Sequence, residues 1–149
     1  MKVVAWAAAL AALAGCGSGQ KMIYVQGVRP LNQNEQGQDT SVNIRVYQLR
    51  DDGRFRQASV EELWRNAKDI LKEDLLAPDQ PITVVPGDAK QDPKEVNLGK
   101  LDLNARFVGI LALFPKDDDK KARKEVVPTD EADDFVFVLT GYHIEKKAR

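Results

Sequence analysis

The sequence has few of the side chains that most often carry chemistry. Its 149 residues include one cysteine, Cys16, and one histidine, His143, which excludes a zinc site built from both residue types and an internal disulfide. It also lacks an excess of positive charge, because 22 Lys and Arg stand against 23 Asp and Glu. Binding to a phosphate backbone needs a dense basic surface, so we expect no nucleic-acid partner. The same inventory predicts no metal site, no cofactor and no catalytic residues.

A membrane-spanning run is lacking as well. The apolar stretch from Val3 to Leu13 follows Lys2 and spans eleven residues, whereas a helix needs about 20 residues to cross a bilayer. A charged start followed by a short apolar stretch is typical of a signal peptide. We therefore predict that residues 1–15 are removed.

The end of this stretch, Leu13-Ala14-Gly15-Cys16, resembles the lipobox of bacterial lipoproteins. The resemblance implies cleavage before Cys16 and covalent lipid on its thiol, which would be the only attached group. Gly17 follows, where an Asp in such lipoproteins favours the inner membrane, so the resemblance implies the periplasmic face of the outer membrane. The alternatives are an ordinary secretory signal with a chance cysteine, or a buried free cysteine.

Residues 16–20 are then the lipidated cysteine and a flexible tether, and residues 21–149 form one domain. Within this domain the pattern is mostly period two, which indicates β-strands. Ser41 to Leu49 alternates most clearly, with Tyr47 on the face expected to be solvated. Arg106 to Phe114 is apolar on both faces, which predicts a central strand, and its Gly109 marks a bulge or a close approach. The other predicted strands are Lys21 to Arg29, Pro81 to Val85, Val96 to Leu103, Phe135 to Thr140 and Tyr142 to Ile144.

One helix is predicted from Ser59 to Leu76. Ser59 and Glu62 match a capping box, and apolar residues recur at helical spacing. Trp64 lies on this stripe and is interpreted as a core residue rather than a ligand-binding aromatic. Pro86-Gly87 predicts a turn with positive φ at the glycine, and the polar tail Glu145 to Arg149 is expected to fray.

Two polar segments interrupt the strands. Leu31 to Thr40 is longer than a hairpin needs, so it is either a plain surface connection or a protruding recognition loop. Lys116 to Lys121 contains three aspartates, but without the spacing of an EF-hand it is interpreted as a solvated turn. The predicted fold class is mainly β: an antiparallel β-sandwich with one inserted amphipathic helix.

Several blocks in this order resemble the TssJ/SciN lipoproteins of type VI secretion systems. After the lipobox come VNIRVYQL (Val42 to Leu49), VVPG (Val84 to Gly87) and VGILALF (Val108 to Phe114). The resemblance implies a transthyretin-like sandwich held at the outer membrane. It also implies a structural role, in which the protein binds the periplasmic C-terminal region of TssM within a complex that includes TssL.

In that family the loop between the first two strands is a principal contact with TssM. The resemblance therefore favours Leu31 to Thr40 as a binding site. The residues it implies are the polar ones of the loop: Asn32, Asn34, Glu35, Gln36 and Gln38.

Two other functions remain open from the residues alone. A periplasmic hydrolase would pair carboxylates such as Glu95 and Asp102 as general acid and base. A carbohydrate-binding or transport-chaperone module would instead show an exposed row of aromatics, for which Tyr24, Tyr47 and Tyr142 are the candidates.

Overall fold

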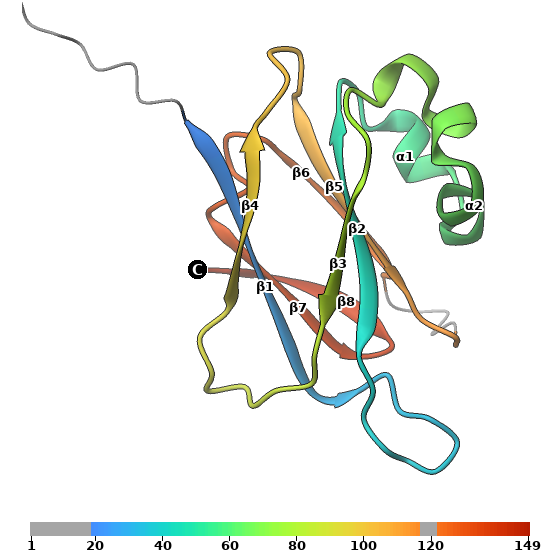
Figure 1. Ribbon diagram of the computed structural model, residues 1–149, viewed down its shortest axis with the longest axis vertical. Helices are drawn as coiled ribbons and strands as arrows, with labels where there is room; N and C mark the ends of the chain where they lie inside the picture. Colours follow the sequence, from blue (N-terminus) through green and yellow to red (C-terminus); the bar gives the residue numbers. More distant parts are fainter. Residues whose placement is uncertain (1–18, 117–121) are drawn as a thin grey trace, which may run out of the picture.

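The computed structural model describes residues 19–116 and 122–149, which form two stacked four-stranded sheets (Figure 1). The first sheet has the order β4-β1-β7-β8 and the second β3-β2-β5-β6. In chain order the strands are β1 (Gln20–Leu31), β2 (Val42–Leu49), β3 (Gln80–Val84), β4 (Lys94–Lys100), β5 (Phe107–Leu113), β6 (Lys124–Pro128), β7 (Phe135–Gly141) and β8 (His143–Ala148). The predicted mainly β sandwich is confirmed. Within the described residues, no helix is long and apolar enough to span a membrane.

The core lies between the two sheets and follows the period-two pattern. Ile23 and Val25 of β1 face Val42, Ile44 and Val46 of β2 within one buried cluster. Neighbouring residues of a strand point to opposite faces of the sheet. The residues between these core positions therefore face either solvent or the helices that cover the second sheet. The alternation read from the sequence thus decides which face of each strand is buried.

Helices cover the outer face of the second sheet (Figure 1). They are α1 (Gly53–Gln57), α2 (Val60–Leu71) and the 3-10 turn η1 (Lys72–Asp74). Tyr47, expected on a solvated face, is fully buried because α1 and α2 pack over it, and its ring lies 5.7 Å from that of Phe55. β5 is covered on both faces as predicted, and Gly109 is a close approach, since a Cβ there would lie 3.0 Å from the Phe55 ring.

The predicted capping box is confirmed at Ser59 and Glu62. The helix itself is shorter than predicted, because it ends at Leu71 and Lys72 takes a φ of 51°. Asn66 also departs from helical geometry, with φ −152° and ψ 50°. Trp64 is half-buried against the helical core cluster, and the guanidinium of Arg45 lies 3.9 Å from its ring centroid.

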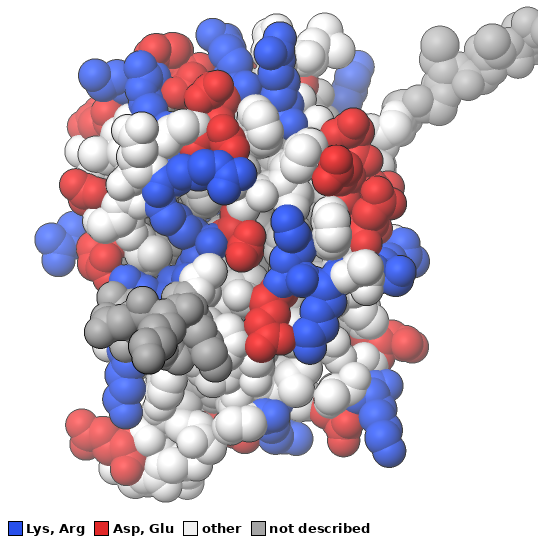
Figure 2. Space-filling view, turned by 180° about the vertical axis from the view of Figure 1, so that it is seen from behind, with Lys and Arg blue, Asp and Glu red and all other residues white. Residues whose placement is uncertain are grey.

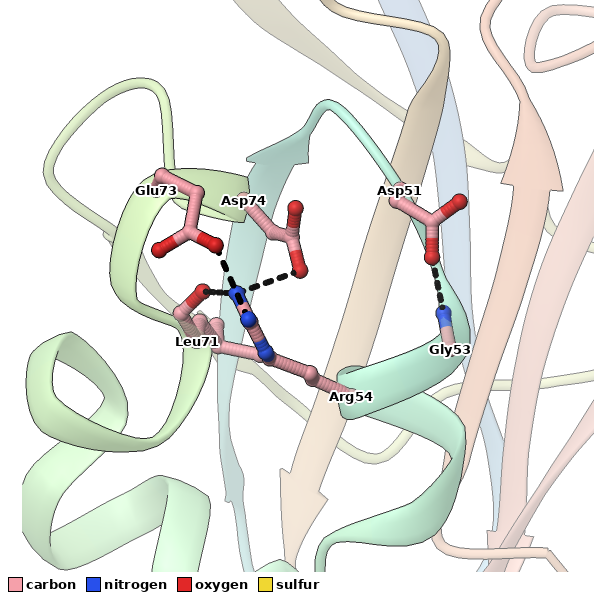
Figure 3. A network of polar contacts seen from close by, with 6 residues as sticks. All are labelled: Asp51, Gly53, Arg54, Leu71, Glu73 and Asp74. Atoms are coloured by element: carbon pink, nitrogen blue, oxygen red, sulfur yellow. Dashed lines mark hydrogen bonds and ion pairs between the residues drawn. The ribbon is translucent and has the colours of Figure 1, made fainter.

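Arg54 joins the two helices through polar contacts (Figure 3). Its guanidinium donates to the Leu71 carbonyl at 3.2 Å and contacts the carboxylates of Glu73 and Asp74 at 2.8 and 3.0 Å. The Arg54 bond is the main reason that the pKa of Glu73 lies below its ordinary value. Together these contacts satisfy carbonyl and carboxylate groups where α2 ends.

Four details of the predicted sandwich are corrected. β1 and β7 run parallel, so the first sheet is mixed rather than wholly antiparallel. The tail from Glu145 does not fray, because β8 pairs with β7 as far as Ala148. β6 was not predicted. Gly87 does not take positive φ; instead its backbone lies close to β1, and a Cβ there would lie 3.1 Å from the Gly27 carbonyl oxygen and meet the Gln91 side chain.

Candidate functional site

The connection between β1 and β2 projects from one end of the sandwich (Figure 1). β1 begins at Gln20 at the other end and is 12 residues long, so the two ends of this strand lie about 40 Å apart. The loop that follows Leu31 is therefore held far from the segment predicted to be the tether. The predicted tether, residues 16–20, is shorter by one residue in the structure, because Gln20 already belongs to β1.

Asn34 organises the tip of this loop. Its side-chain oxygen accepts hydrogen bonds from the backbone N–H groups of Gln36 and Gln38 at 3.0 and 2.9 Å. Its carbonyl accepts from Gly37 N–H at 2.9 Å, which closes a turn in which Gly37 has a φ of 72°. Asn is favoured at the first position of such a turn and Gly at the fourth, so this spacing was a readable signal in the sequence.

Asn32 fixes the base of the loop. It has a φ of 45°, which Asn tolerates better than most residues. Its N–H donates to the Gly141 carbonyl at 2.8 Å, and its side-chain amide donates to the Thr40 hydroxyl and the Ser41 carbonyl. These bonds close the loop on itself and join it to the end of β7.

The β7–β8 turn supports the loop from the side. The hydroxyl of Tyr142 donates to the Gln33 carbonyl at 2.8 Å, and its ring packs edge-on against Phe114 at 6.3 Å. Asp39 accepts from the Leu31 N–H at 2.9 Å and pairs with Arg29. The loop is thus ordered by its own side chains and by a neighbouring turn, without a partner.

The five predicted contact residues divide into two groups. Asn32 and Asn34 are half-buried and hold the loop, so their contribution to any contact is indirect. Glu35, Gln36 and Gln38 are exposed at the tip. The arrangement presents one carboxylate and two amides on a preordered turn, which suits polar recognition of another protein.

The surface elsewhere carries mixed charge. Figure 2 shows lysines, arginines and acids interspersed over the face behind the view of Figure 1, without a broad area of one sign. Within the described residues, no three Cys, His, Asp or Glu side chains lie close enough to hold a metal ion.

The carboxylates considered for a hydrolase are not brought together. Glu95 pairs with Tyr24 in the β1–β4 ladder, whereas Asp102 lies beyond Lys100, the residue opposite Gln20. Asp102 instead organises a turn by accepting from the Asn104 N–H at 2.8 Å. The two acids therefore do not form a general acid and base pair.

The three tyrosines do not form an exposed row either. Tyr47 is fully buried, Tyr24 is half-buried under Arg149, and Tyr142 holds the loop.

His143 begins β8 and is buried, with its Nε2 atom 3.0 Å from the Glu145 carboxylate. That bond is the leading reason that the pKa of Glu145 lies below its ordinary value.

The predicted lipidation residue, Cys16, lies outside the described part of the chain, as does most of the charge run after Lys116. The predicted lipobox residues Leu13, Ala14 and Gly15 lie outside it as well. Their roles stay predictions.

Comparison with known families gives one match that covers most of the sequence. Residues 21–145 match the model of the type VI secretion lipoproteins VasD, EvfM and TssJ, named T6SS-SciN. The chain belongs to this family. The family is one of structural lipoproteins of the type VI secretion system, as the resemblance in the sequence predicted. The comparison with curated protein sequences gives no match.

Solved structures agree on the fold. Serratia marcescens Lip, described as a membrane-bound component of the type VI secretion system, has a TM-score of 0.73 and 23% identity over 87% of this chain and 96% of its own. The lipoprotein TssJ1 of Pseudomonas aeruginosa has a TM-score of 0.70 and 24% identity over 87% and 95%. A chain in the structure named "T6SS protein TssM C-terminal domain (869-1107) from EAEC" has a TM-score of 0.70 and 22% identity over 87% and 98%. The T6SS-SciN chain described here therefore has the transthyretin-like sandwich of the TssJ structures.

Proposed function

We propose that this T6SS-SciN protein tethers a type VI secretion trans-envelope complex to the outer membrane. In this proposal, lipid on Cys16 anchors the chain at the periplasmic face, and Gly17 permits its passage to the outer membrane. The β1–β2 loop binds the periplasmic C-terminal region of TssM, within a complex that includes TssL. The protein acts as a structural link and carries out no reaction.

The observation that carries this proposal is the loop itself. It is ordered by Asn34 and Tyr142, and it exposes Glu35, Gln36 and Gln38 at the end of the sandwich opposite the start of β1. A partner that binds there does not have to compete with the bilayer for space. Because the loop is already ordered, binding costs less conformational entropy than it would for a flexible segment.

The comparisons support the choice of partner. One of the matched chains belongs to the structure named for TssM residues 869–1107. The match covers 87% of this protein and 98% of that chain. The matched chain is therefore close to this protein in length and much shorter than the TssM segment. A complex of a TssJ-like chain with TssM would contain both a short chain of this length and the longer TssM segment.

The contact is tested by replacing the exposed loop residues together. We expect the variant Glu35→Ala/Gln36→Ala/Gln38→Ala to bind the cognate TssM periplasmic region at least about tenfold more weakly by calorimetry, as the loss of an interface hot spot would do. Asp130→Ala/Glu131→Ala, which removes exposed acids between β6 and β7, is the matched control and should bind normally. Unchanged affinity of the loop variant, with an unchanged circular dichroism spectrum, would contradict the loop assignment.

The anchor is tested separately by Cys16→Ser. Without the thiol there is no site for lipid, so the protein should move from the outer-membrane fraction to the soluble periplasm. A Cys16→Ser protein that still sediments with the outer membrane would refute the anchor.

A further inference from the structure

The turn between β4 and β5 carries the most exposed large apolar side chain of the described residues. Leu103 is 95% exposed, compared with 64% for Val85 and 36% for Leu113. A single exposed leucine needs no explanation by itself, since such residues are common on protein surfaces. Leu103 is nevertheless of functional interest, because of its position in the fold and because its turn is held by hydrogen bonds.

The turn is fixed by hydrogen bonds on both sides of Leu103. The Asp102 N–H donates to the Gln48 side chain at 2.9 Å, and the Asp102 carboxylate accepts from the Asn104 N–H at 2.8 Å. The Ala105 N–H donates to the Asp102 carbonyl at 3.0 Å, and the Arg106 N–H donates to the Leu49 carbonyl at 2.9 Å. Leu103 is thus held outward at the tip of an ordered turn.

This turn lies at the end of the sandwich where β1 begins (Figure 1). Lys100, three residues before Leu103, is the ladder partner of Gln20, and the Asn97 side chain donates to that of Gln20 at 2.7 Å. Gln20 is four residues after Cys16, and a fully extended chain of that length reaches at most about 14 Å. A lipid on Cys16 therefore holds this end of the molecule against the bilayer surface.

We propose that this end faces the membrane and that Leu103 inserts into the lipid interface. The inference rests on the lipid anchor of the proposed function and goes beyond it, because it assigns a second membrane contact and an orientation. A lone leucine binds a membrane weakly from solution. Next to a lipid anchor its insertion becomes an intramolecular event at high effective concentration, so one side chain is enough to bias the orientation.

The charges around the turn indicate the chemistry of this contact. Lys100 and Arg106 flank Leu103 and are exposed, as are Asp102 and the acids Asp130 and Glu131. Because this set is mixed in sign, the contact depends on apolar insertion rather than on attraction to anionic headgroups. It should then be insensitive both to salt and to the proportion of anionic lipid.

The test uses the lipidated full chain in vesicles of phosphatidylethanolamine and phosphatidylglycerol. Asn104→Cys gives a labelling site beside Leu103, since the thiol of Cys16 is occupied by lipid, and the label is an environment-sensitive fluorophore. With Leu103 present, we expect blue-shifted emission, quenching by brominated lipid and protection from iodide. Leu103→Asp should shift the emission to the red and expose the label to iodide.

The matched control is Val85→Asp, which changes an exposed apolar residue next to the end of β3, at the loop end of the sandwich. It should leave the label at position 104 shielded. If the parent, Leu103→Asp and Val85→Asp proteins all float with the vesicles but iodide reaches the label equally in each, the insertion of Leu103 is overturned. The lipid anchor of the proposed function would be unaffected by that result. Failure of the parent protein to float would overturn the lipid anchor of the proposed function and this inference with it.

Discussion

The phenol of Tyr142 and the backbone carbonyl of Gln33 are joined by a 2.8 Å hydrogen bond across 109 residues of sequence. Tyr142 lies in the turn between β7 and β8, and Gln33 lies in the β1–β2 loop. This bond connects the half-buried start of the loop to the β7–β8 turn through a ring that also packs on Phe114. The shape of the loop therefore depends on a residue outside it.

Tyr142→Phe should loosen the loop while leaving the sheet intact. We expect a loss of about 1 kcal/mol in the free energy of unfolding, because a half-buried carbonyl loses its donor. The amide hydrogens of Gly37 and Gln38 should exchange faster. Tyr24→Phe is the control, since the Tyr24 hydroxyl makes no hydrogen bond within residues 19–116 and 122–149, and equal effects of the two variants would contradict this role of Tyr142.

Arg54→Met should destabilise the helical layer. The substitution removes all three contacts at the end of α2 and leaves Asp74, which is 8% exposed, without its cation. We expect a lower midpoint of urea unfolding than for the parent protein, because the buried Asp74 carboxylate loses its charged partner. Arg56→Met breaks only the exposed pair with Asp52 and should cost about 0.5 kcal/mol or less. A similar cost for both variants would show that the Arg54 contacts are unimportant.

Gly109→Ala should destabilise through a clash with Phe55. The added Cβ would lie 3.0 Å from two ring atoms and 3.1 Å from a methyl of Leu49, in a fully packed region. The expected cost is about 1–3 kcal/mol, typical of an overpacked core. Phe55→Leu removes most of the ring, so the double variant should lose less stability than the sum of the single variants. Strict additivity of the two costs would contradict the clash.

Glu62→Gln should make stability less dependent on pH in acid. The Ser59 backbone N–H and hydroxyl donate to the Glu62 carboxylate at 2.8 and 3.0 Å, and the pKa of Glu62 is consequently lower than usual. A carboxyl group with a lower pKa in the folded state stabilises fully above its unfolded pKa of about 4.3, and this contribution is lost as the pH falls through the folded value.

Glu62→Gln should therefore be less stable than the parent near neutrality, and the difference should narrow as the pH falls from about 5 to about 3. Thermal unfolding across this range measures it. Glu35→Gln, at an exposed loop position, is the control and should follow the parent curve. A difference between Glu62→Gln and the parent that stays constant with pH would contradict the role of the capping box.

Short sequence patterns predicted several strands and the start of one helix. Period-two alternation identified β1 and β2, apolar runs identified β5 and β7, and the capping box at Ser59 identified the start of α2. Of β8 only the start was predicted, within the strand Tyr142 to Ile144. The rest of β8 is the polar segment EKKA, yet lysines are common on edge strands, where they discourage further pairing. β6 was missed because KEVVP follows a charge run and is only five residues long.

Features that depend on distant residues could not be predicted from local patterns. The parallel pairing of β1 with β7 joins segments about a hundred residues apart, and no local pattern contains it. Tyr47 looked solvated because its strand alternates, but two helices formed elsewhere bury it. In the loop, composition identified the polar residues, whereas only the fold separates Asn32 and Asn34, which hold it, from the exposed residues at its tip.

The position of β1 within its sheet has a mechanical consequence. It is hydrogen-bonded on both sides, to β4 and to β7, and it runs from the end nearest Cys16 to the loop. A pull between those two points acts along the strand, at right angles to the hydrogen bonds of the antiparallel ladder. The force is then shared by many hydrogen bonds loaded in shear, so these bonds do not break one after another. If the chain links the outer membrane to a secretion complex, as proposed above, the load would act along this axis, in which the strand resists force best.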